Sequence, residues 1–148
     1  MFFAVFLAEL IVGYYVNQIQ HRILGDALSR AANAYYVLWI KPAHLASIGF
    51  VWNPLPSLLE LPFMVFAQIW RPIASSALAG LFWTAAFTAG SAALIYNNCR
   101  HFKLSSLATW GITLLFSLNP FIFVYGFNAM SEAFFIFFII LTCQELMN

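Results

Sequence analysis

The chain contains an apolar run from Pro72 to Tyr96 in which no side chain is charged. A helix over such a run can cross the hydrocarbon core of a bilayer, which is about 30 Å thick and requires about 20 apolar residues. Composition extends this interpretation to the whole chain, since 64% of its 148 residues are hydrophobic and 7% are charged. Soluble domains carry about 25% charged residues. The sequence therefore predicts an all-α integral membrane protein.

Apolar runs with the composition of membrane spans occur four times along the chain. We expect transmembrane helices over about residues 2–17, 72–96, 106–126 and 131–147. Together they would form one module that covers residues 1–148. Glu9 interrupts the first run, where a carboxylate is either a packed polar contact or a functional group.

A long connection at residues 18–71 separates the first two predicted spans and holds most of the charged residues and prolines of the chain. We expect it to lie outside the membrane on one face. Within it, Leu28 and Tyr35 belong to an apolar stripe with helical spacing, while Asp26 and Arg30 fall on the opposite side. This pattern predicts an amphipathic helix that lies on the membrane surface.

The apolar stretch at residues 57–70 is shorter than a membrane span and contains Pro62, which disrupts a helix interior. We expect it to be re-entrant or embedded in the membrane without crossing it. This point affects function, because an additional crossing would place Asp26 and Glu132 on opposite faces.

These two acids would share one membrane face in the four-span topology. Two spans separate the 18–71 connection from the turn before Glu132, so both lie on the same side. Asp26 and Glu132 would then bind a divalent cation, or act as a base and its electrostatic partner. A structural interpretation stays open, in which Asp26 caps one helix and Glu132 stabilises the positive end of another.

Basic residues near the spans also extend to ordinary head groups, but six of them are candidates for binding the phosphate of a lipid, namely His21, Arg22, Arg30, Lys41, His44 and Arg71. A net charge of +1 offers no basic surface for nucleic acid. The two cysteines, Cys99 and Cys143, lie far apart and are expected to be free thiols. No phosphate-binding loop or hydrolase motif is present.

The order of three segments gives a resemblance to a known class of enzymes. GDALSR follows the first span, PLPSLLELPF precedes the second, and NPFIFVYGFNAMSEAFF leads into the fourth. This order resembles the N-terminal module of polytopic GT-C glycosyltransferases of family 39, which includes protein mannosyltransferases and aminoarabinose transferases. Because the last apolar run stops close to Asn148, we expect the chain to be the N-terminal part of such a protein.

The resemblance implies a membrane glycosyltransferase that transfers a sugar from a polyprenyl-phosphate donor to an extracytoplasmic acceptor, most naturally in a bacterial plasma membrane. Asp26 in GDALSR would be the general base, and Glu132 would be the second acid and a ligand of a divalent cation. Arg30, Lys41 and Arg71 would contact the donor phosphate. Further spans or partner subunits would complete the enzyme. The rival hypothesis is a non-catalytic scaffold, transporter piece or subunit that packs through its small-residue second span.

Overall fold

The computed structural model describes residues 1–50 and 54–147, and this part of the chain contains helices and no strands. The α-helices are α1 (Phe2–Tyr14), α2 (Gly25–Trp39), α3 (Pro54–Met64), α4 (Pro72–Ser75), α5 (Leu78–His101), α6 (Ser106–Ser117), α7 (Pro120–Phe127) and α8 (Glu132–Met147). A π-helical turn η1 (Tyr15–Ile19) extends α1, and a 3-10 turn η2 (Leu45–Ile48) follows α2. The all-α prediction is confirmed.

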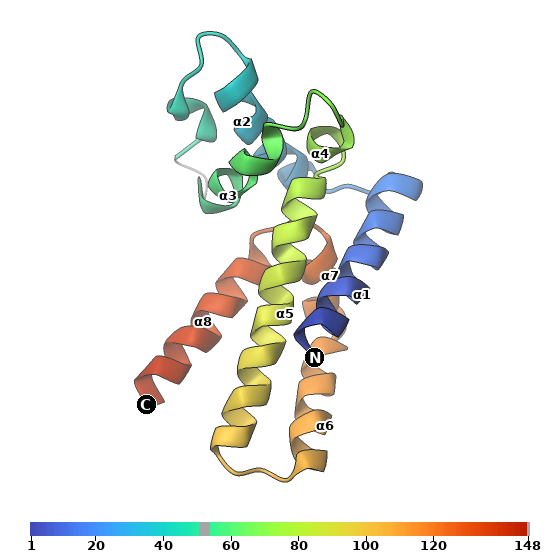
Figure 1. Cartoon of the computed structure of the whole chain (residues 1–148), viewed down its shortest axis with the longest axis vertical. Coiled ribbons are helices and arrows are strands. Elements are labelled where there is room, and N and C mark those ends of the chain that lie inside the picture. Colours follow the sequence, from blue (N-terminus) through green and yellow to red (C-terminus); the bar gives the residue numbers. More distant parts are fainter. Residues whose placement is uncertain (51–53, 148) are drawn as a thin grey trace.

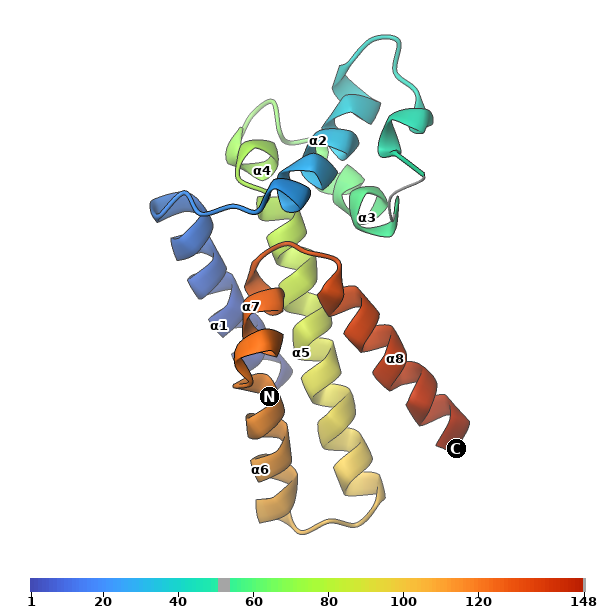
Figure 2. The same cartoon turned by 180° about the vertical axis from the view of Figure 1, so that it is seen from behind.

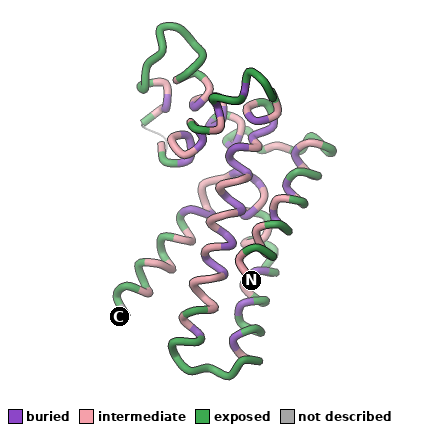
Figure 3. The backbone as a smooth tube through the Cα atoms, in the orientation of Figure 1, coloured by how far each residue is buried: buried purple, intermediate pink, exposed green. Residues whose placement is uncertain are grey.

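Helix α5 is the central element of the structure (Figure 1). α1, α8 and the pair α6 and α7 pack around it, and both views show α2, α3 and α4 gathered at the end where α5 begins (Figure 2). The α5–α6 loop lies at the opposite end. Figure 3 shows that burial is concentrated along α5 and at its junction with α2–α4, whereas the end of α8 and the α5–α6 loop are exposed.

Two helices are long and apolar enough to cross a membrane, namely Phe2–Ile19 and Leu78–His101. A third crossing is present if α6 and α7 act as one span, although they are bent by 60° relative to each other. Helix α8 has 16 residues in the described part of the chain and is not among these candidates. The structure therefore supports two or three spans, and the predicted count of four is not confirmed.

The second predicted span, residues 72–96, has different boundaries in the structure. A short α4 ends at Ser75, and Ala77 has the left-handed φ of 50° before α5 begins. Hydrophobicity does not mark this break, because Ser and Ala suit both a span and a turn. At the other end α5 continues to His101, where basic side chains stabilise the negative end of the helix dipole.

The bend between α6 and α7 has a direct cause in the sequence. Pro120 occupies the first position of α7, and its ring disfavours a helical conformation for Asn119. The side chain of Asn119 caps the new helix by accepting a hydrogen bond from the backbone N–H of Phe121 at 3.0 Å. The predicted continuous span at 106–126 is therefore two helices.

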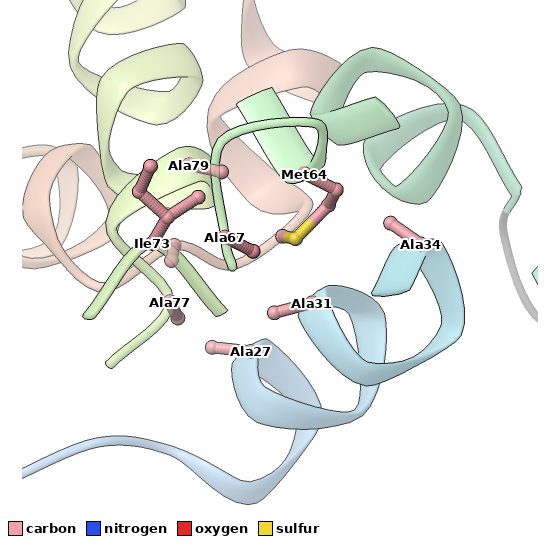
Figure 4. Packing of buried hydrophobic residues seen from close by; sticks show 9 residues of the cluster. Ala27, Ala31, Ala34, Met64, Ala67, Ile73, Ala77 and Ala79 are labelled. Carbon is pink, nitrogen blue, oxygen red and sulfur yellow. The ribbon is translucent and has the colours of Figure 1, made fainter. Parts of the chain in front are cut away.

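Helix α2 buries a face of small residues. Ala27, Ala31 and Ala34 are fully buried and pack in one cluster with Met64 of α3 and residues of the α4–α5 region (Figure 4). Small side chains allow helix backbones to approach closely. Arg30 is on this buried side, so its predicted place on the outer polar side of the helix was wrong. The buried face was predicted from the large apolar residues, whereas the face that is buried carries alanines.

Helix α3 is attached to its neighbours by two tryptophans. The indole N–H of Trp39 donates to the carbonyl of Met64 at 2.9 Å, and that of Trp83 donates to the carbonyl of Leu59 at 2.7 Å. These bonds hold α3 beside α2 and the start of α5. The 57–70 segment stays at this end of the bundle, and neither α3 nor the turns after it qualify as a span.

Gly80, in the first turn of α5, gives a test of this packing. A Cβ atom there would lie 2.9 Å from the Cβ of Ala129, whereas a Cβ at Gly111 in α6 would meet nothing within 4 Å. We predict that Gly80→Ala destabilises the protein by about 1–3 kcal/mol through overpacking. Gly111→Ala should stabilise it by about 0.5–1 kcal/mol. Unfolding in detergent measures both, and equal changes in the two variants would contradict the packing described.

Candidate functional site

Arg30 is the centre of a buried polar cluster where α2 meets the turn before α8. Its side chain belongs to a residue that is only 3% exposed. One terminal nitrogen donates to the hydroxyl of Ser131 at 3.2 Å, and the other contacts the sulfur of Met130 at 3.5 Å. A guanidinium stays charged at all physiological pH values. These contacts therefore join two segments that are about a hundred residues apart in the sequence.

The two acids predicted to form the site lie on either side of this contact. Asp26 is one helical turn before Arg30 and is exposed, and Glu132 directly follows Ser131 and is half-buried. The structure thus brings both acids to the same end of the bundle. The N-cap of α2 is Leu24, and no side chain caps this helix. The alternative in which Asp26 is the helix cap therefore finds no support in the geometry.

Glu132 begins α8, where the positive end of the helix dipole favours a carboxylate. Its Oε2 atom is buried and has no hydrogen-bond partner within the described residues. Buried polar atoms in native proteins are nearly always paired. An oxygen in this state can accept a hydrogen bond from a bound hydroxyl group.

Glu60 is a third acid in this region, and no functional role was predicted for it. It is 1% exposed, and neither carboxylate oxygen has a hydrogen-bond partner within the part of the chain that the structure describes. Burial raises the pKa of Glu60 to about 8, while the positive charge of Arg30 acts in the opposite direction. The sequence did contain one indication that Glu60 is unusual, because it is the single acid in the otherwise apolar segment PLPSLLELPF.

Glu9 is also fully buried, but it lies in α1, within the candidate span Phe2–Ile19. Its carboxyl group packs against Gly126 of α7, where any Cβ atom would be about 2.5 Å from it. Neither oxygen has a hydrogen-bond partner in the described structure. Glu9 therefore holds α1 close to α7 and contributes nothing to the cluster around Arg30.

The side chains of this site are poor ligands for a divalent cation. Calcium takes six to eight oxygen ligands, and magnesium requires octahedral geometry. In residues 1–50 and 54–147, no three His, Cys, Asp or Glu side chains gather at one point. Asp26 and Glu132 lie on different helices, and the guanidinium of Arg30 already supplies positive charge at the turn before Glu132. These donors do not fit a cation held by the chain alone.

The three basic residues expected to contact the donor phosphate are in different surroundings. Arg30 points into the protein, as described. Lys41 is exposed beyond the far end of α2, about 20 Å along the helix from Asp26. Arg71 is exposed and lines a cavity of about 500 Å³ on the side of α2 that carries Leu28 and Tyr35. Of these three residues, Arg30 is the one that contacts the turn before Glu132.

The raised pKa of Glu60 predicts a specific pH dependence of stability. Between its unfolded pKa of 4.5 and its folded pKa of about 8, the folded state binds a proton that the unfolded state has lost. Stability therefore falls as the pH rises through this window. Glu60→Gln should make this fall shallower by the contribution of Glu60, which thermal unfolding at pH 5, 6, 7 and 8 would measure. Parallel curves for the two proteins would contradict a neutral, buried Glu60.

Comparison of the chain with protein-family models, with curated proteins and with solved structures gives no match. The resemblance to GT-C glycosyltransferases thus rests on the three sequence segments that suggested it. The helical fold and the cluster around Arg30 are established independently of that resemblance.

Proposed function

We propose that this chain is the N-terminal membrane module of a glycosyltransferase that moves a sugar from a polyprenyl-phosphate donor to an acceptor hydroxyl. One observation supports the proposal most strongly, namely the contact between Arg30 and Ser131. It joins the helix of Asp26 to the turn that directly precedes Glu132. Two acids from distant parts of the sequence thus reach one end of the bundle, as a shared catalytic site requires.

Asp26 is suited to act as the general base because its carboxylate is exposed and accessible to an acceptor. It would take the proton of the acceptor hydroxyl while that oxygen attacks the anomeric carbon of the sugar. The bond from this carbon to the phosphate oxygen would break, and the polyprenyl phosphate would leave with the electron pair. Proton transfer of this kind contributes about 10²–10⁴ in rate.

Glu132 and Arg30 would have supporting roles in the same step. The unpaired Oε2 of Glu132 can accept a hydrogen bond from a sugar or acceptor hydroxyl and so fix its orientation. Arg30 provides fixed positive charge next to α8, which favours the negative charge that develops on the departing phosphate. All of these groups lie at the α2–α4 end, where a lipid-linked sugar can meet water while its tail remains in the bilayer.

The proposal places the α2–α4 end on the extracytoplasmic face of a plasma membrane, with further spans completing the acceptor site. A scaffold function is the rival hypothesis. The rival hypothesis used the small residues of the second span as a partner surface. In the structure Ala85, Ala89 and Ala92 of α5 are fully buried inside this chain, so they offer no free surface.

Asp26→Asn and Glu132→Gln are expected to lower sugar transfer by different amounts in membranes that contain the complete protein. Loss of the base should reduce the rate about 10²–10⁴-fold. Loss of the Glu132 charge should reduce it about tenfold or more, the effect of one weakened hydrogen bond to a charged group. Transfer of radiolabelled sugar from a polyprenyl-phosphate donor measures both.

Glu145→Gln provides the matched control, since Glu145 is an exposed acid near the other end of α8. This variant should retain full transfer. Full activity of Asp26→Asn, with normal helix content and normal amounts of protein in the membrane, would rule out the role assigned to Asp26.

A further inference from the structure

An apolar groove of about 440 Å³ lies between α1, the start of α5 and the chain between α3 and α4. Its walls are hydrocarbon and aromatic groups, and the polar groups among them are the hydroxyl of Tyr14 and the indole N–H of Trp70. Both helices that form the groove belong to candidate membrane spans. The residues that line it include Leu10, Tyr14, Phe63, Trp70, Leu81 and Phe82.

The segment that follows the groove lines the separate cavity that contains Arg71. Trp70 and Ile73 line the groove, while Arg71 and Ala74 line the cavity. Arg71 is the one charged residue among those that line either space. At the rim of the cavity, the side-chain amide of Gln68 donates to the hydroxyl of Tyr35 at 2.9 Å. Consecutive residues thus present an apolar surface on one side and a cation on the other.

Exposed apolar residues next to the groove suit a surface that faces lipid. Phe66 is 57% exposed and Ile69 is 86% exposed, four residues and one residue before Trp70. Exposed apolar side chains of this size are stable in contact with hydrocarbon. Tyr14 and Trp70 at the groove are of the type that occupies the head-group level of membranes. The groove therefore opens at the depth where acyl chains meet head groups.

We propose that this groove and the Arg71 cavity together bind one anionic membrane phospholipid. An acyl chain would lie in the groove, and the phosphate would reach around Trp70 to the guanidinium of Arg71. Charge complementarity selects an anionic lipid, because no acid among the described residues lines either space. The site does not include Asp26 or Glu132, so it is independent of the proposed transferase activity.

Native mass spectrometry of the chain, purified from nanodiscs with equal amounts of phosphatidylglycerol and phosphatidylcholine, tests the proposal. The unmodified chain should retain phosphatidylglycerol about fivefold over phosphatidylcholine, the factor expected for one arginine at an anionic membrane. Arg71→Gln should remove this preference, and Arg71→Lys should keep most of it. Lys41→Gln is the matched control, because Lys41 is exposed outside the cavity, and it should leave the preference unchanged.

A separate variant tests the role of the groove. Ile11 lines it and is 68% exposed, so Ile11→Trp should fill the opening without disturbing the core and should lower retention of both lipids. The proposal is overturned if Arg71→Gln keeps the preference, or if Lys41→Gln loses as much. It is also overturned if Ile11→Trp retains lipid like the unmodified chain. Retention of free glycerophosphate in place of the lipid would assign the cavity to a soluble anion and would overturn it as well.

Discussion

The burial of one arginine determines how the parts of this protein meet. The guanidinium of Arg30 cannot lose its charge, so its position inside the protein requires polar partners within reach. It finds the hydroxyl of Ser131 and the sulfur of Met130, and Glu60 lies within its field. These contacts bring α2, its neighbour α3 and the turn before α8 together at the end where α5 begins.

Small residues make this convergence sterically possible. The alanine face of α2 allows it to lie against α3 and the α4–α5 junction, and Gly80 allows the turn around Ala129 to approach α5. Gly13 and Gly126 let α1 pack against α5 and α7. The acids at the candidate site are thus held by close backbone packing and by a single charged contact, with Asp26 left open to solvent.

Hydrophobic runs in the sequence predicted the helical membrane class and the shared location of Asp26 and Glu132, because spans alternate in direction. They did not predict the break at Ala77, since serine and alanine mark neither a turn nor a span. They also predicted the wrong buried face of α2. Alanine is only weakly hydrophobic, but its small side chain favours close contacts between helices. Glu60 was missed because its burial depends on α2 and α5, which are distant in sequence.

The topology is the central claim, since the site exists only if α2 and the start of α8 share a face opposite the α5–α6 loop. Single cysteines at Ser29 and Phe102, both exposed, test it in a chain that lacks Cys99 and Cys143. A membrane-impermeant thiol reagent on intact cells should label one of the two positions, and the other only after permeabilisation; an extracytoplasmic site requires the labelled one to be Ser29. If both positions respond alike, α5 does not cross the membrane and the account is wrong.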